Sequence, residues 1–222
     1  LPFAVLPFGA FCGGLISTLA LYLIATRQGR TSVATMLLAG VALGALAGAM
    51  TGLLAFISDD RQLRDLTFWS MGSLGGASWT KLSAIAPIII PLLLAMPLLA
   101  RGLNGLMLGE AEAYHLGIPV QRIKALAILL VALAVGASVA AAGLIGFVGI
   151  VVPHLIRLAI GPDHRLLLPL SALGGAILLV GADIVARLVV APAELPIGIV
   201  TAAIGAPFLL WLLQRRSGPL DV

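Results

Sequence analysis

Long apolar stretches without charged residues alternate with short polar segments along the whole 222-residue chain. A bilayer core about 30 Å thick takes about 20 helical residues to cross, so stretches of this length predict membrane-spanning helices. The qualifying stretches are residues 1–26, 31–58, 82–100, 125–156, 166–182 and 195–214. We therefore expect an all-α, polytopic membrane helix bundle that forms a single transmembrane domain over residues 1–222.

The stretch 125–156 is too long for one straight span. Its second half contains residues that loosen or break a helix, namely Gly143, Gly146, Gly149 and Pro153. We expect one helix to about Ala142 and then a short, broken helix through Arg157. With a sixth helix over 165–190 and a seventh over 194–214, the chain would have about seven membrane helices.

The composition agrees with a bilayer environment. Hydrophobic residues make up 61% of the chain, charged residues 10%, and the mean hydropathy is +1.16. Ordinary soluble domains carry roughly 25% charged residues, so a soluble domain is excluded and membrane lipid is the expected surrounding. The formal net charge of +4 does not indicate nucleic acid, because the basic residues are scattered singly between apolar runs.

The polar connections are expected near 27–31, 58–81, 101–122, 159–165 and 190–194. Short basic loops tend to stay in the cytoplasm, so the distribution of Lys and Arg predicts orientation. One side collects nine of the 13 basic residues: Arg27, Arg30, Arg101, Arg122, Lys124, Arg157, Arg165, Arg215 and Arg216. The other side holds Arg61, Arg64, Lys81 and Arg187. The loops after the first and third helices and the C-terminus are therefore expected in the cytoplasm.

Glycine recurs at every fourth position of the second stretch, at Gly40, Gly44, Gly48 and Gly52. This spacing lays a groove along one helix face, where another helix backbone can approach closely. It predicts packing in a tight multi-helix bundle.

The segment GLIGFVGIVVPHLIR (143–157) resembles the hallmark stretch of permeases that import iron-siderophore complexes, haem and cobalamin. Upstream segments LAGVALG (38–44) and FWSMGSLGGASW (68–79) also match, so the resemblance covers nearly the whole chain. Further blocks follow in the order and spacing of that family: GPDHR (161–165), ADIVAR (182–187), ELPIG (194–198) and GAPF (205–208). On these motifs the chain resembles the FecCD-like permeases of type II ABC importers, and haem permeases most.

The resemblance implies a ten-helix permease that works by alternating access in the bacterial inner membrane. It implies a homodimer around a central pathway, two cytoplasmic ATPase subunits and a periplasmic substrate-binding protein. The chain lacks what would be the first three helices, so we expect the C-terminal part of such a permease, as a fragment or a natural truncation. No G-x-x-x-x-G-K-[ST] segment occurs in the sequence. We expect ATP and Mg²⁺ on the partner ATPase, and no catalytic residue, metal ion or cofactor on this chain.

Residues 107–118 lie on the predicted cytoplasmic side. Their sequence predicts a short helix closed by Gly117, with Pro119 starting the next helix. By resemblance this segment is a coupling helix that fits a cleft in the ATPase. Composition alone equally allows a solvated interfacial turn, because acidic side chains here would face water in either case. The predicted coupling residues are Gly109, Glu110, Glu112, His115, Leu116 and Gly117.

Thr31 and Ser32 occupy the cytoplasmic turn before the second helix. They resemble the position of the family's cytoplasmic gate at the bottom of the pathway. The alternative is a helix cap, since both hydroxyls can accept backbone donors.

Arg187, Arg61 and Arg64 are expected on the periplasmic side. By resemblance Arg187 would meet a carboxylate of the binding protein, and the other two are further docking candidates. Arg187 also lies one helical turn from Asp183, and an intramembrane charge normally has a partner, so a structural pair is the alternative.

Two other function classes are weaker. An ion-coupled secondary transporter usually places an acidic residue near the membrane midplane, and only Asp183 comes close. An intramembrane enzyme needs converging catalytic groups or metal ligands, whereas His115, His154 and His164 form no close ligand pair in the sequence. For the cargo, residues 61–72 resemble haem importers somewhat more than siderophore or cobalamin importers.

Overall fold

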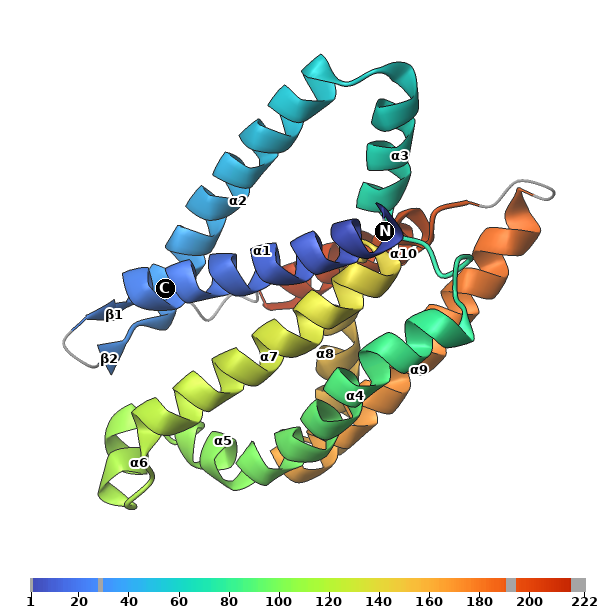
Figure 1. Cartoon of the computed structure of the whole chain (residues 1–222). Helices are drawn as coiled ribbons and strands as arrows, with labels where there is room; N and C mark the ends of the chain where they lie inside the picture. Colours follow the sequence, from blue (N-terminus) through green and yellow to red (C-terminus); the bar gives the residue numbers. More distant parts are fainter. Residues whose placement is uncertain (1, 28–29, 191–194, 217–222) are drawn as a thin grey trace. The chain divides into compact units, whose positions relative to one another are not determined.

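The computed structural model describes residues 2–27, 30–190 and 195–216. The described chain is helical except for one pair of two-residue strands (Figure 1). Contacts between Cα atoms divide it into two compact units. The first comprises Leu1–Thr67 and Ser78–Ala141, and the second comprises Phe68–Ala77 and Ala142–Val222.

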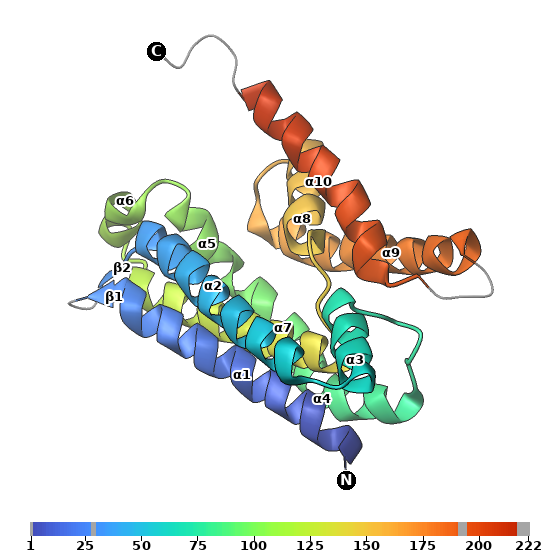
Figure 2. The same ribbon diagram turned by 90° about the horizontal axis from the view of Figure 1, so that it is seen from above.

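The first unit holds the long helices of the N-terminal half. Helices α1 and α2 pack against each other and are joined by the short antiparallel strands β1 and β2 (Figure 2). Ser32 caps α2 by accepting a hydrogen bond from Thr35 N–H, and Ser78 caps α4 in the same way. Its elements are α1 (Pro2–Ala25), β1 (Thr26–Arg27), β2 (Arg30–Thr31), α2 (Val33–Ile57), the start of α3 (Asp60–Met71), α4 (Trp79–Ala95), η1 (Met96–Leu99), α5 (Ala100–Leu106), α6 (Glu110–His115) and nearly all of α7 (Val120–Ala142).

In the second unit α8 (Val148–Ile160), α9 (His164–Val189) and α10 (Ile197–Arg216) pack against one another. Helix α10 also approaches the end of α3, where a Cβ at Gly198 would lie 2.2 Å from the Met71 carbonyl oxygen. Its core consists of small and branched apolar side chains. The least exposed large side chain is that of Ile197, at 1%. Small residues at the crossing allow close helix approach, as in other membrane bundles. The core residues are Ala182, Ala186, Ile197 and Val200.

The break between α7 and α8 falls where the sequence predicts it, because α7 ends at Ala142. Gly143 has a φ of 74°, in the left-handed region that favours glycine. A Cβ at position 143 would lie 2.4 Å from the Trp69 carbonyl oxygen, so only glycine fits this close approach. Ser73 N–H also donates to the Ala142 carbonyl at 2.8 Å, which ties the break to the end of α3.

Five helical segments of the described chain are long and apolar enough to cross a membrane: Phe8–Ala25, Val33–Ile57, Trp79–Leu106, Val120–Ala142 and His164–Val189. Val148–Ile160 and Ile197–Leu212 are shorter apolar helices. Together they correspond to the seven predicted membrane helices and confirm the all-α membrane fold. The predicted start of the last helix, Glu194, lies outside the described residues.

Helix α3 was not predicted, because residues 58–81 were interpreted as a polar connection. It begins with a reciprocal capping box, in which Gln62 N–H donates to Asp59 Oδ1 at 2.7 Å and Asp59 N–H donates to Gln62 Oε1 at 3.3 Å. The expectation was wrong because the segment's polarity and shortness hid an amphipathic helix.

The glycine stripe of α2 makes no close helix contact along most of its length within the described residues. A Cβ at Gly44, Gly48 or Gly52 would meet no heavy atom within 4 Å, and one at Gly40 would meet only Leu21 Cδ2 at 3.9 Å. The predicted close helix contact along this face therefore stays a prediction.

Candidate functional site

Helix α6 is a single short helix held in place by its one buried side chain. Gly109, at its N-cap, has a φ of 107°. Ala113 is fully buried, at 0% exposure, and its N–H donates to the Gly109 carbonyl at 3.0 Å. Ala113 therefore faces inward, whereas Glu110 and Glu112 are exposed.

The C-terminal end of α6 is a complete Schellman motif. Ile118 N–H donates to the Ala113 carbonyl at 3.0 Å, and Gly117 N–H donates to the Tyr114 carbonyl at 2.9 Å. Gly117 has a φ of 78°, the left-handed conformation that this motif requires. The prediction that Gly117 closes this helix is confirmed.

Two glycines of α5 bring that helix into contact with the chain after α6. A Cβ at Gly105 would lie 2.0 Å from Ile118 Cδ1, and one at Gly102 would lie 2.7 Å from Ile123 Cδ1. These close approaches join α5, α6 and the first turn of α7 into one packed group. We call this group, residues 100–123, the α6 corner.

The outer surface of the α6 corner is apolar and acidic. Glu110, Glu112 and His115 are exposed, and the side chain of Glu110 is 53% exposed. Large apolar side chains lie beside them: Met107 at 50%, Leu108 at 63%, Tyr114 at 73% and Leu116 at 64% exposure. A surface of this kind is suited to burial against a protein partner.

The strand pair β1–β2 lies at the same end of the first unit as α6 (Figure 2). Ser32 N–H donates to the Ala25 carbonyl at 3.0 Å. Because hydrogen-bonded and non-hydrogen-bonded pairs alternate in an antiparallel ladder, Thr26 and Thr31 form a non-hydrogen-bonded pair. Their hydroxyl oxygens lie 2.9 Å apart. The peptide groups of Thr31 therefore point away from β1.

Side chains from α7 satisfy both peptide groups of Thr31, which is only 4% exposed. Thr31 N–H donates to Gln121 Oε1 at 3.1 Å, and Lys124 Nζ donates to the Thr31 carbonyl at 2.9 Å. The Lys124 ammonium also pairs with the Glu110 carboxylate. The structure thus brings together one predicted gate residue and one predicted coupling residue.

Gln121 and Lys124 were missed as site residues. Lys124 was used only to predict orientation, and its partner Thr31 lies 93 positions away in the sequence. Their three-residue spacing places both on one face of α7. That spacing is the only local sequence signal for a shared role, and it does not indicate which residues the two side chains contact.

Ser32 behaves as the alternative prediction requires, since its hydroxyl caps α2 at 3.3 Å from Thr35 N. Thr31 does not cap the helix, because its hydroxyl pairs with Thr26 instead. This capping role does not exclude a gating role for Ser32, because the residue still lies at the N-terminal end of α2.

The arginines predicted to dock a partner lie in both units. Arg61 and Arg64 are exposed on α3 in the first unit. In the second unit, Arg187 Nε donates to Asp183 Oδ2 at 2.8 Å, and the Arg187 side chain is still 46% exposed. The predicted structural pair is therefore present, and it leaves part of the guanidinium accessible.

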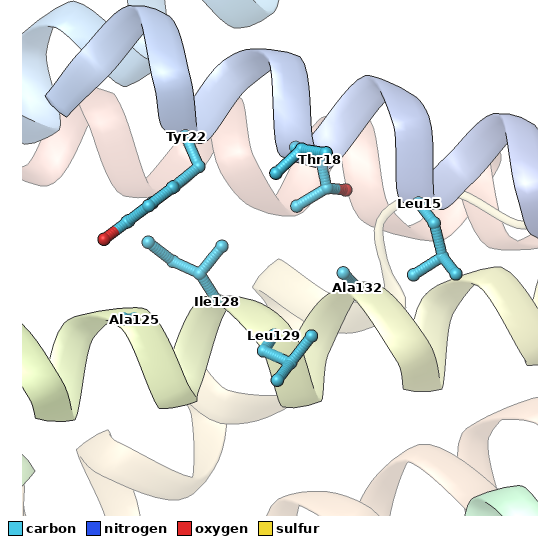
Figure 3. Close-up of a pocket in the computed structure, with 8 residues that line it drawn as sticks. Leu15, Thr18, Tyr22, Ala125, Ile128, Leu129 and Ala132 are labelled. Atoms are coloured by element: carbon cyan, nitrogen blue, oxygen red, sulfur yellow. The ribbon is translucent and has the colours of Figure 1, made fainter.

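A cavity of about 200 Å³ lies between α1 and α7 in the first unit (Figure 3). The helices come close where a Cβ at Gly14 would lie 3.6 Å from Gly136 Cα, and Tyr22 and Thr18 of α1 line the cavity. Its lining is almost entirely apolar, including Leu15, Ile128 and Leu129. The cavity is suited to an apolar group and offers no set of ligands for a metal ion.

Comparison with known families decides the assignment. The model of the FecCD transport family matches residues 1–215. The chain belongs to the FecCD transport family. The multi-pass membrane fold and the resemblance drawn from the sequence are confirmed.

Several curated relatives are about half identical to this chain over the aligned residues. The hemin transport system permease protein HmuU of Yersinia pestis is 52% identical over 94% of this chain and 62% of its own length. The vitamin B12 import system permease protein BtuC of Vibrio cholerae is 49% identical over 93% of this chain and 62% of its own length. The cobalamin permease BtuC of Halobacterium salinarum is 45% identical over 94% and 56%. The chain thus spans about three fifths of the length of these relatives.

A solved structure reported as an ABC transporter of the metal-chelate type, in an inward-facing conformation, has the same FecCD-like fold. It superposes with a TM-score of 0.81 at 32% identity, covering 96% of this chain and 74% of that chain. The helix order described above is therefore that of a transporter membrane subunit.

Proposed function

We propose that this FecCD-family chain forms most of the membrane-spanning permease subunit of an ATP-driven importer. The α6 corner is the observation that supports this best. It presents a short helix, closed at its C-terminal end by a Schellman motif and backed by α5, with exposed apolar and acidic side chains. Such a preformed projection fits a cleft in a partner and transmits movement without deforming.

In this proposal the residues Gly109 to Gly117 form the coupling contact with a cytoplasmic ATPase. Closure of two ATPase subunits on ATP would move the α6 corner as a rigid body, and α7 would move with it because the two are packed together. Thr31 and Ser32 would form the cytoplasmic gate at the base of the pathway. The permease itself hydrolyses nothing, and ATP and Mg²⁺ reside on the partner.

The complete assembly would contain two permease copies, two ATPase subunits and a periplasmic binding protein in the bacterial inner membrane. The C-terminus would be cytoplasmic, as the basic residues predict. Arg61, Arg64 and the exposed part of Arg187 would receive acidic groups of the binding protein. A partly exposed arginine can form such a contact without losing its intramolecular partner.

Haem is the cargo that we propose first, because the hemin permease is 52% identical to this chain. Cobalamin is the second candidate, because two cobalamin permeases are 49% and 45% identical. Both cargoes are metal chelates, which agrees with the metal-chelate type of the similar solved structure.

The test is reconstitution of the permease with its ATPase subunits in liposomes. ATP hydrolysis is measured with binding protein loaded with haem, loaded with cyanocobalamin, or empty. Stimulation by haem alone supports the proposal in full, and stimulation by cobalamin alone retains the importer and replaces the cargo. Failure of any ATPase subunit to associate would refute the importer.

A further inference from the structure

We propose that Lys124 is a positioning residue that transmits movement of α6 to the Thr31–Ser32 segment. The inference rests on the proposed function, because it takes α6 as the ATPase contact and Thr31–Ser32 as the gate. The observation behind it is the bridge in which one ammonium group holds both the Glu110 carboxylate and the Thr31 carbonyl.

The Thr31 carbonyl depends on this bridge for its hydrogen bond. It points away from β1, and the residue is 4% exposed, so water cannot readily replace a lost donor. A buried carbonyl left without a donor destabilises the local structure. Lys124 is thus a structural requirement of the segment in its present position.

The Lys124 side chain is itself largely buried, at 11% exposure, whereas that of Glu110 is 53% exposed. A buried ammonium needs compensating partners, and its two acceptors, the Thr31 carbonyl and the Glu110 carboxylate, lie on different elements. If α6 moves away from Lys124, the ammonium loses its anionic partner. If β2 moves away, the ammonium loses its carbonyl acceptor. Either displacement is costly unless α6, α7 and β2 move together.

Gln121 forms a second connection between β2 and α7, and this connection does not involve α6. Its amide oxygen accepts from Thr31 N–H, one turn before Lys124 on α7. Gln121 therefore ties β2 to α7, whereas Lys124 ties β2 to both α7 and α6. Loss of Gln121 would therefore weaken only the attachment of β2 to α7, whereas loss of Lys124 would also disconnect β2 from α6. A contiguous set of contacts of this kind is a physical route for coupling between two sites.

The experiment uses the permease–ATPase complex in lipid nanodiscs, with four single variants and one double variant that combines Glu110→Gln with Lys124→Met. Lys124→Met removes the ammonium but keeps the apolar stem, and Lys124→Arg retains a cation. Glu110→Gln removes the anionic partner. Arg122→Met is the matched control, because Arg122 lies between the two α7 residues and is exposed.

Two quantities are measured for each variant. Amide hydrogen exchange of the peptide covering residues 26–33 reports the hydrogen bonds of Thr31 and needs no cargo. The ratio of ATP hydrolysis with and without loaded binding protein, tested with haem and with cyanocobalamin, reports coupling. Basal hydrolysis and the amount of bound ATPase subunit are recorded as references.

We expect Lys124→Met to speed exchange of the segment by about tenfold and to lower the stimulation ratio to a similar degree. Lys124→Arg should restore much of both, and Arg122→Met should change neither. Glu110→Gln combined with Lys124→Met should be no worse than Lys124→Met alone, because both disrupt one ion pair.

Each other outcome overturns the inference. Unchanged exchange in Lys124→Met would show that the bridge does not hold Thr31. Faster exchange with an unchanged stimulation ratio would make the bridge structural only. A wild-type complex that neither haem nor cyanocobalamin stimulates would instead refute the two proposed cargoes, and the exchange of residues 26–33 would still decide whether the bridge holds Thr31.

Discussion

The break between α7 and α8 gives a stability prediction that can be calculated from the structure. An alanine at Gly143 would place its Cβ 2.4 Å from the Trp69 carbonyl oxygen and 3.1 Å from Gly72 Cα. The oxygen cannot simply move, because it accepts a hydrogen bond from Gly72 N–H at 3.2 Å. The φ of 74° adds a second cost, since an alanine avoids this region.

The two costs together predict a loss of several kcal/mol. A non-glycine residue in the left-handed conformation costs roughly 1–2 kcal/mol. Overpacking typically costs about 1–3 kcal/mol. The middle of the combined range, about 3.5 kcal/mol, corresponds to a Tm lower by roughly 7–14 °C for a domain of this size.

The assay is thermal unfolding of the detergent-purified permease. The fraction that stays folded after heating is measured by size-exclusion chromatography with fluorescence detection. Gly146→Ala is the matched control, because a Cβ there meets no atom within 4 Å and its φ is not positive. The control should keep its Tm or gain slightly, through reduced freedom of the unfolded chain. Equal Tm values for the two variants would refute the reasoning about the break.

Three further predictions concern the partners and α3. Gly117→Val should lower cargo-stimulated ATP hydrolysis with normal membrane insertion, because its φ of 78° closes α6; unchanged stimulation would count against the coupling role. Asp59→Ala should destabilise α3 by about 1 kcal/mol, measured by faster amide exchange of 60–67, and Gln62→Ala should act in the same direction with a smaller effect. Arg61→Glu with Arg64→Glu should weaken binding-protein association most at low salt; a salt-independent affinity equal to wild type would remove both from the docking surface.

The sequence was sufficient wherever the signal is local. Apolar length predicts the membrane helices, and the glycines after Ala142 predict the end of α7. Gly117 followed by Pro119 predicts the end of α6. Glycine readily adopts the left-handed conformation that ends a helix, and proline, which lacks an N–H, favours the first turn of the next helix. Such signals need only a few adjacent residues.

Other features required information that no short window holds. The contact of Lys124 with Thr31 depends on how α7 packs beside the strand pair, and nothing in either segment specifies the other. Helix α3 is different, because its capping box, Asp59 and Gln62, is a local sequence signal. It was overlooked because the polar composition of residues 58–81 was interpreted as a loop. The α2 glycines specify a close approach but not the chain that makes it.

The Schellman closure of α6 has a consequence for the rate and the heat-capacity change of ATPase association. A segment that folds on binding loses conformational entropy at that moment, and it shows a large heat-capacity change. Helix α6 already has its Schellman closure and its buried Ala113 before any partner arrives. Calorimetry of assembly should therefore give a heat-capacity change set by the docked area alone. The association rate should lie in the range of preformed interfaces, about 10⁵–10⁷ M⁻¹s⁻¹.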